Sequence, residues 1–248
     1  MYAMENTLNN YPSLANNHIS VDCVVIGFDG EKIKVLLIKR VGEDEGKAYS
    51  DMKLPGSLIY TDEDLDEAAR RVLYELTGLK TVNLMQFKAF GSKNRTSNPK
   101  DVRWLEHAIH SKVDRIVTVA YMAMVKIDRA LIRSLEEYQA NWMSLKDIKT
   151  LAFDHNLIIK EALFYIRRYV EFNCSVLFDL LPRKFTATQL RTLFELIYDK
   201  PIDARNFHKK MSVMKYVVPL EEYQKGVPYR AARYYRFDKK IYNKEKRS

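Results

Sequence analysis

Apolar side chains in the first two thirds of the chain alternate in a way that predicts strands. Residues 19–28 and 32–40 are aliphatic, β-branched runs separated by an Asp-Gly turn, and they predict a β-hairpin. Two further strands are expected over residues 81–90 and 115–125. Strands mixed with few helices predict a protein of the α+β class.

A helical period follows the Pro-Gly turn near residue 56. One helix face carries the apolar residues Leu65, Ala69, Val72, Leu73 and Leu76. Thr61 or Asp62 is expected to cap the start of this helix, and Gly78 is expected to end it. Another helix is expected to begin near Asp154.

Two short helices and a hairpin are predicted towards the C-terminus. Thr186, with Gln189 three residues later, forms the pattern of a capping box before the apolar face Leu190, Leu193, Phe194 and Ile197. Asp203 can cap a second helix with the core residues Phe207, Met211 and Met214. Short strands over residues 227–229 and 232–237 would complete a winged helix-turn-helix.

Composition narrows the class of protein. Apolar residues make up 47% and charged residues 29% of the 248 positions, which excludes disordered and collagen-like chains. The polar start of the chain does not resemble a signal peptide, and the apolar runs are too short to span a bilayer. Cys23 and Cys174 both lie in apolar contexts and are expected to be reduced thiols. We therefore expect a cytoplasmic protein without a membrane partner.

Positive charge is concentrated near the C-terminus. The net charge of the chain is +9, and residues 183–248 contain 17 Lys and Arg against 7 Asp and Glu. Such an excess suits either a solvated surface or a polyanion partner, and its combination with the predicted winged helix favours DNA. We place a sensing domain at residues 17–165 and a DNA-binding domain at residues 175–242. The expected DNA contacts are Lys184, Thr188, Arg205, Asn206, His208, Lys209, Ser212, Arg230, Arg233 and Arg236.

The first helix carries part of a known motif. Ser57, Glu63, Arg71, Glu75, Gly78 and Leu79 have the spacing of the Nudix box, so this region resembles the Nudix family. Val72 and Leu76 stand where that family has glutamates. Hydrolysis in the family needs several carboxylates on this face to hold divalent cations. The resemblance thus implies a Nudix-like α/β/α sandwich that has no catalytic activity and holds no cofactor or metal. Arg71 and Glu75, four residues apart on the helix, are then expected to form an ion pair. The alternative is an active pyrophosphohydrolase with displaced ligands.

The order of the two domains resembles the Nudix-related transcriptional regulators. The matching stretches are residues 151–155, 180–186, 203–210 and 233–237, and the resemblance extends over about residues 17–240. It implies a homodimer that reads a palindromic operator and is released by a small effector. One branch of these regulators responds to ADP-ribose and controls NAD metabolism. The sequence looks closer to the arabinose-responsive sugar-utilisation regulators of Bacteroides, which implies a pentose, L-arabinose, as the effector.

Candidate effector-binding residues are charged or polar side chains of the predicted strands, before the Pro-Gly turn and at the start of the helix near residue 154: Asp22, Lys39, Arg40, Lys53, Asp154 and His155. Asp22 interrupts an apolar strand and is either satisfied within the fold or kept for sugar hydroxyls. Lys39 and Arg40 point to opposite faces, so one of them could reach the cavity. Asp154 is either a helix cap or a pocket residue. The loss of metal-binding carboxylates favours a neutral sugar over a nucleotide diphosphate.

Residues 92–112 form a polar insertion, which we expect to be an irregular loop on the surface. Closure over the effector and contact with DNA are its other possible roles. Glu106, His107 and His110 within it have spacing compatible with a metal, although a solvated helix face explains them better. A third class of function, a nucleic-acid-coating protein, would bind duplexes without regard to sequence.

Overall fold

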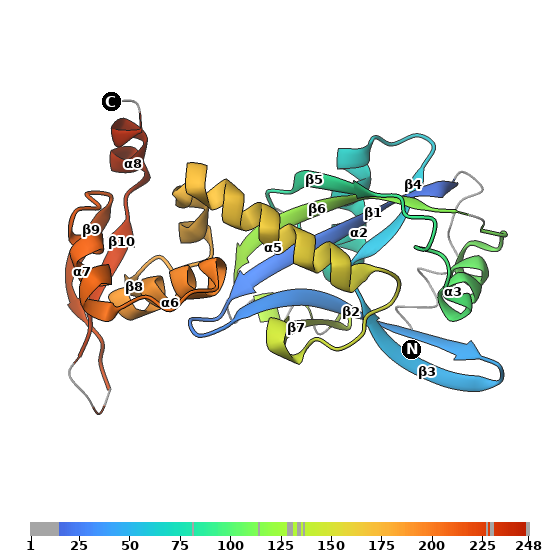
Figure 1. Cartoon of the computed structure of the whole chain (residues 1–248), viewed down its shortest axis with the longest axis horizontal. Helices are drawn as coiled ribbons and strands as arrows, with labels where there is room; N and C mark the ends of the chain where they lie inside the picture. The colour runs from blue at the N-terminus through green and yellow to red at the C-terminus, as the bar shows by residue number, and fades with distance from the viewer. Residues whose placement is uncertain are drawn as a thin grey trace. The chain divides into compact units, whose positions relative to one another are not determined.

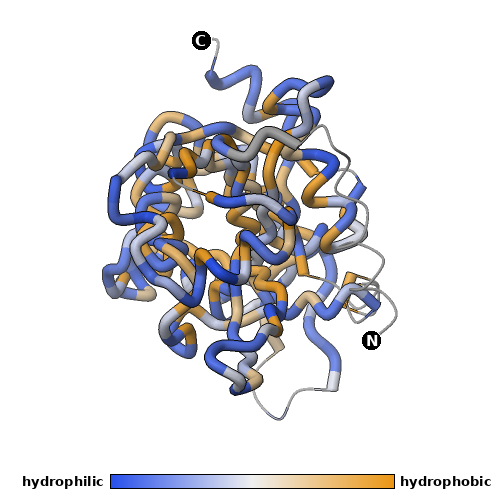
Figure 2. Tube along the Cα trace, turned by 90° about the vertical axis from the view of Figure 1, so that its right-hand side faces the viewer, coloured by the Kyte–Doolittle hydropathy of each residue, from blue (hydrophilic) through white to orange (hydrophobic). Residues whose placement is uncertain are grey.

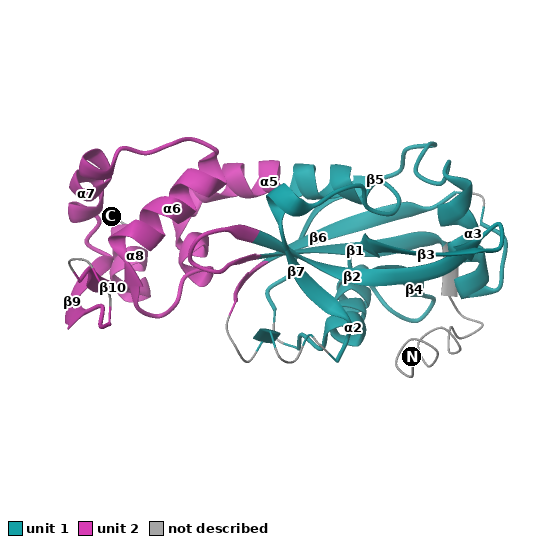
Figure 3. Cartoon of the chain, turned by 90° about the horizontal axis from the view of Figure 1, so that it is seen from below, with its two compact units in different colours: residues 1–26, 34–123, 128–162 teal, residues 27–33, 124–127, 163–248 magenta. Residues whose placement is uncertain are grey.

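The chain folds into two compact units in the computed structural model, which describes residues 15–80, 82–113, 115–127, 131–132, 135, 137–226, 228 and 231–246. The first unit comprises the ranges 1–26, 34–123 and 128–162, and the second comprises 27–33, 124–127 and 163–248 (Figure 3). In the described residues, no helix is long and apolar enough to cross a membrane.

A seven-stranded sheet forms the centre of the first unit (Figure 1). Its main path runs β3-β2-β1-β6-β5, with β4 paired to β1 and β7 paired to β2. The strands are β1 (Ala15–Phe28), β2 (Ile33–Asp44), β3 (Lys47–Lys53), β4 (Gly56–Tyr60), β5 (Met85–Phe90), β6 (Val117–Lys126) and β7 (Ala140–Ser144). The β1–β2 pair confirms the predicted hairpin strands, since the apolar runs that predicted them are almost completely buried.

Helix α2 (Leu65–Thr77) and the first part of α5 (His155–Phe172) lie on opposite faces of this sheet in the first unit (Figures 1 and 3). The predicted apolar face of α2 is confirmed in its centre, where Ala69, Val72 and Leu73 are buried. Gly78 ends α2 in the left-handed conformation that glycine adopts without steric cost. The predicted cap was wrong: Asp64, in place of Thr61 or Asp62, closes a capping box with Glu67.

The polar insertion is more ordered and more buried than predicted. Residues Pro99–Ile109 form helix α3, with Asn98 as the N-cap and proline in the first turn. Arg95 and Asp101 are buried, and Leu105 and Ile109 pack against a small core of Leu58, Val113 and Ile116. The expectation of an irregular surface loop was therefore wrong, because paired charges make this polar segment compatible with burial.

The second unit contains the predicted winged helix. Helix α6 (Ala187–Tyr198) begins at the capping box of Thr186 and Gln189, as predicted, and buries the predicted apolar face. Asp203 caps α7 (Ala204–Ser212), which buries Phe207 and Met211. A three-stranded sheet in the order β8-β10-β9 completes the unit, with β8 (Phe185–Thr186), β9 (Val217–Tyr223) and β10 (Arg233–Phe237). The second unit also contains the 3₁₀ helix η2 (Cys174–Asp179) and helix α8 (Lys239–Glu245), and the 3₁₀ helix η1 (Leu145–Asp147) belongs to the first unit.

The first wing strand lies earlier than predicted. Val217–Tyr223 forms β9, whereas the expected strand over residues 227–229 falls partly outside the described residues. Tyr235 pairs with Pro219 in β9 and with Phe185 in β8, which places β10 in the middle of the small sheet. The rings of Phe178 and Phe237 stack 4.2 Å apart in the second unit.

Replacing Thr186 with alanine is expected to destabilise α6 by about 1 kcal/mol, because the Gln189 amide would lose its capping acceptor. Native-state hydrogen exchange of the α6 amides in the full chain measures this loss. Thr188→Ala is the matched control, since Thr188 is exposed in the first turn of the same helix. Equal opening free energies in the two variants would contradict the capping role.

Candidate functional site

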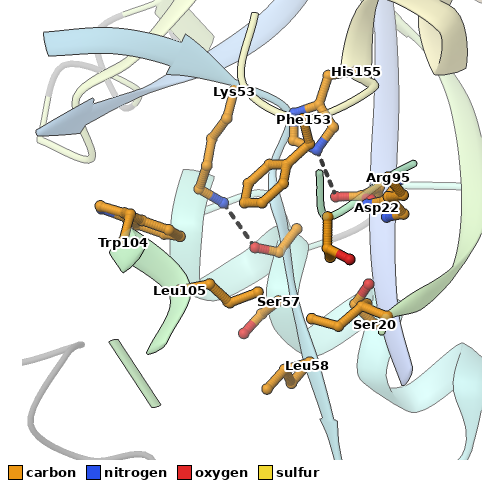
Figure 4. Close-up of a pocket in the computed structure, with 13 residues that line it drawn as sticks. Ser20, Asp22, Lys53, Ser57, Leu58, Arg95, Trp104, Leu105, Phe153 and His155 are labelled. Carbon is orange, nitrogen blue, oxygen red and sulfur yellow. Dashed lines mark hydrogen bonds and ion pairs between the residues drawn. The ribbon is translucent and has the colours of Figure 1, made fainter. Parts of the chain in front are cut away.

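A polar pocket opens beside β1 in the first unit, and Figure 4 shows the side chains around it. Strand β1, the β3–β4 turn, the insertion and the start of α5 all contribute to its walls. The lining residues are Ser20, Asp22, Lys53, Gly56, Ser57, Leu58, Arg95, Thr96, Trp104, Leu105, Ile116, Phe153 and His155.

Asp22 is the central charge of this pocket and is only 4% exposed. One carboxylate oxygen accepts a hydrogen bond from Arg95 Nη2 at 2.7 Å, and the other lies 3.4 Å from His155 Nε2. Burial favours the protonated acid, yet the neighbouring His155 and Arg95 hold the pKa of Asp22 well below its usual range. Asp22 is therefore ionised, and its partners lie within the fold. Arg95 also forms an ion pair with Asp154.

His155 links Asp22 to the β3–β4 turn. Its Nδ1 accepts a hydrogen bond from the Leu54 amide at 3.0 Å, so the neutral ring carries its proton on Nε2, towards Asp22. Burial lowers the pKa of His155 below 6.5, although the nearby Asp22 opposes that shift. The ring is therefore neutral at pH 7 and positions both groups without adding charge.

Lys53 and Gly56 shape the turn over the pocket. The Lys53 ammonium donates to the Gly56 carbonyl at 2.8 Å and to the Leu54 carbonyl at 3.3 Å. Burial lowers its pKa to about 8, with Asp22 acting in the opposite direction. A Cβ on residue 56 would lie 1.9 Å from Asp22 Oδ1, so only glycine allows the turn to approach the carboxylate this closely.

Trp104 and Phe153 give the pocket an aromatic wall, with ring centroids 6.5 Å apart. Phe153 has a φ of 54°, a conformation that non-glycine residues rarely adopt. Its amide donates to Asp101 Oδ2 at 2.9 Å, which fixes this turn against α3. The wall therefore depends on the insertion as well as on the start of α5.

Arg40 supports the wall from behind. It is 1% exposed, forms ion pairs of 2.7 Å with Asp51 and Asp101, and places its guanidinium 5.4 Å from the rings of both Trp104 and Phe153. Hydrogen bonds from Arg40 keep the pKa of Asp51 below its usual value in spite of burial. Arg40 thus supports the pocket without lining it.

The predicted effector residues separate into two groups. Asp22, Lys53 and His155 line the pocket together, and Asp154 joins them through Arg95. Lys39 is exposed and, like Arg40, is absent from the lining, so the expectation that one of these two faces the cavity was wrong. The missed residues Arg95 and Trp104 come from the insertion, whose polarity had suggested a surface role; an isolated tryptophan among its charges was the available signal.

Three of the Nudix-box residues, Glu63, Arg71 and Glu75, are joined by hydrogen bonds. Arg71 donates through Nε to Glu63 at 2.8 Å and through Nη1 to Glu75 at 3.1 Å, and its guanidinium lies 3.7 Å from the Tyr60 ring. Val72 is completely buried in the core. Among the described residues, no group of three or more His, Cys, Asp or Glu side chains is arranged to hold a metal ion.

The predicted DNA contacts form an exposed surface on α7 of the second unit. Arg205, Asn206, His208, Lys209 and Ser212 are all exposed, and the two buried α7 residues, Phe207 and Met211, hold the helix from the opposite side. Thr188 of α6 is also exposed. This arrangement presents a basic helix face to a partner, as recognition of a major groove requires.

Three predicted DNA-binding cations outside α7, of which Arg233 and Arg236 belong to the predicted wing, are engaged by acidic side chains. Lys184 binds Glu222 at 2.7 Å, Arg233 binds Glu221 as well as the Leu220 carbonyl, and Arg236 binds Asp238 at 2.9 Å. Arg230 lies outside the described residues. These pairs reduce the positive charge that the wing can offer to phosphates.

Two domain families match the chain. Residues 16–163 match the NUDIX domain, and residues 177–237 match the NrtR DNA-binding winged helix domain. Over 233 residues, the chain is 26% identical to a protein of Acinetobacter baylyi named ADPR responsive transcriptional repressor NtrR, covering 92% of this chain and 84% of that protein.

Solved structures share the fold across both units. NrtR of Shewanella oneidensis in complex with a 27mer DNA is 21% identical, with a TM-score of 0.62 over 89% of this chain and 93% of that one. A MutT/nudix family protein of Enterococcus faecalis is 22% identical, with a TM-score of 0.58 over 96% of this chain and 99% of that one. The expected Nudix fold followed by a winged helix is therefore confirmed.

His155 is expected to make the first unit less stable as the pH falls from 6.5 to 5. In the unfolded chain His155 binds a proton as the pH falls below about 6.5, whereas the buried ring of the folded chain stays neutral because its pKa is lower. The free energy of unfolding therefore decreases by up to about 1.4 kcal/mol for each unit by which the pH falls. Asp22 contributes in the same direction, but only nearer pH 4 and below. His155→Gln keeps a donor and an acceptor without titrating, so its unfolding free energy should change less over this interval.

Urea unfolding at pH 6.5 and pH 5 measures this difference. The fluorescence of Trp104 and Trp142 reports on the first unit, which contains both tryptophans. His107→Gln is the matched control, because His107 is exposed. An identical pH dependence for wild type and His155→Gln would contradict a neutral, buried His155.

Proposed function

Because the chain belongs to the Nudix family and carries an NrtR-type winged helix domain, we propose that it is a DNA-binding transcriptional repressor that responds to a small effector. The exposed basic face of α7 carries this proposal. The Nudix domain, residues 17–165, acts as the sensor, and residues 175–242 bind DNA as the winged helix. A homodimer would place two α7 helices on the half-sites of a palindromic operator.

Repression is favoured over catalysis by the relatives and by the box residues. The similar Acinetobacter protein is named a repressor, and the Nudix-box arginine of this chain is engaged with Glu63 and Glu75. An active pyrophosphohydrolase would release AMP and ribose phosphate from ADP-ribose in the presence of Mg²⁺ or Mn²⁺. We expect ADP-ribose to be recovered intact, and steady turnover that is lost in Glu75→Gln would establish the enzyme instead.

ADP-ribose is the first effector to test, because the Acinetobacter repressor is named as ADPR responsive. The relatives give no support to the arabinose and sugar-utilisation interpretation. The pocket nevertheless makes a free sugar the second candidate. The cations of the pocket already have partners within the fold: Arg95 pairs with Asp22 and Asp154, and Lys53 donates to two carbonyls. A diphosphate is bound by cations that can pair with its own oxygens.

Arg205→Ala is expected to weaken binding to a specific operator by about ten- to a hundredfold, because an exposed α7 cation would no longer reach the groove. Operators selected from random duplexes, followed by fluorescence anisotropy at fixed salt, give the affinity ratio. The matched control is Arg70→Ala, which removes an exposed arginine from α2. Unchanged affinity in Arg205→Ala would remove this residue from the recognition surface. A wild type that binds all duplexes equally would favour a nucleic-acid-coating protein.

Trp104→Ala is expected to weaken effector binding about tenfold, because it removes half of the aromatic wall. Calorimetric titrations with ADP-ribose and with L-arabinose measure both candidates on the same preparation. Tyr74→Ala, an exposed aromatic on α2 outside the pocket, is the control. Binding of ADP-ribose supports the first candidate and binding of arabinose alone supports the second. A bound effector whose affinity is unaffected by Trp104→Ala would place its site elsewhere.

A further inference from the structure

The winged helix is followed by a short basic helix that lies beyond the matched domain. That match ends at residue 237, and α8 begins at Lys239. From residue 239 to residue 246 the chain has four lysines and one glutamate, and all five of these side chains are exposed. In Figure 2, the trace leading to the C-terminus is correspondingly hydrophilic. The fold of the matched domain does not by itself account for this charge.

Tyr242 anchors α8 on the core of the second unit. Its ring packs edge-on against Tyr216 at 5.1 Å and lies 5.7 Å from Phe237. Its hydroxyl is 3.3 Å from Asn173 Oδ1 and also contacts Cys174. A helix fixed by three elements of the unit holds its lysines in a defined place.

The same anchor places α8 beside the end of α7. The Asp238 amide donates to the Tyr216 carbonyl at 2.8 Å, and the Asp238 carboxylate caps α8 through the Lys240 and Ile241 amides. Lys215 lies three residues after the end of α7, is 79% exposed, and approaches Glu245 of α8 at 3.7 Å. We call Lys215, Lys239, Lys240, Lys244 and Lys246 the C-terminal lysine patch.

We propose that the C-terminal lysine patch binds the phosphates of duplex DNA beside the site contacted by α7. The inference rests on the proposed DNA-binding function and adds a second surface to it. The wing cations Arg233 and Arg236 are engaged by carboxylates of their own unit. All five lysines of the patch are exposed, and Lys215 lies 3.7 Å from Glu245. Lysine ammonium groups suit phosphate oxygens as point charges and carry no information about base sequence.

The test neutralises α8 in the full chain by Lys239→Gln, Lys240→Gln, Lys244→Gln and Lys246→Gln together. The control neutralises Lys47, Lys146, Lys149 and Lys160, four exposed lysines of the first unit, in the same way. Binding to a fluorescent 30-base-pair duplex of random sequence and to a selected operator is measured by anisotropy over a series of salt concentrations. Each lost phosphate contact lowers the slope of log affinity against log salt by about 0.9.

We expect the α8 variant to lower this slope by about 2 to 4 and to weaken binding to both duplexes by the same factor. The control should keep the wild-type slope. An unchanged slope in the α8 variant overturns the proposal, as does an equal loss in the control, which would reflect net charge alone. Loss of binding to phosphatidylserine vesicles with an unchanged DNA slope also overturns it, in favour of a membrane surface. A wild type that binds neither duplex contradicts the proposed function itself.

Discussion

The buried ion pair between Asp22 and Arg95 is the interaction on which the pocket depends. It joins β1 to the insertion, and Arg95 extends the link to Asp154 at the start of α5. Burial of either charge alone would be costly, so Asp22 requires the insertion to fold against the sheet. Replacing such a pair by apolar residues can leave stability unchanged. Its consequence here is the placement of polar groups around a cavity.

The sequence predicted elements whose periodicity comes from one buried face. The apolar stripe of α6 and the alternation of β1 are of this kind, because burial of such a face determines the local conformation. The insertion was predicted to be an irregular loop because charged side chains dominate it. Its burial depends on partners more than fifty residues away, such as Asp154 for Arg95 and Phe153 for Asp101. Asp22 could be selected as a candidate because it interrupts an apolar strand. Lys53 and His155 could be selected because they stand before the Pro-Gly turn and at the start of the predicted helix. Their contacts with Arg95 and Trp104 could not be predicted, since long-range ion pairs leave no local pattern.

Charge in the winged helix illustrates the same limit. An excess of positive charge could be counted along the chain, but the carboxylates that engage it could not be assigned. Arg236 and Asp238 are close in sequence, whereas Lys184 and Glu222 meet only through the small sheet. Positive charge on the wing is therefore partly neutralised by carboxylates, and exposed positive charge lies on α7 and α8. The number of charges in the sequence predicts the chemical class of the partner. The ion pairs in the structure determine which surface can bind that partner.

In the proposed repressor, the affinities for operator and effector are linked by thermodynamics, whichever effector occupies the pocket. If an effector lowers the affinity for operator by some factor, operator must lower the affinity for that effector by the same factor. The pocket wall at Phe153 immediately precedes α5, a continuous helix that extends from the first unit into the second. A ligand that binds equally well to the DNA-bound and free states would release nothing, however tightly it bound. An effector of the proposed repressor must therefore bind two arrangements of the pocket with different affinities.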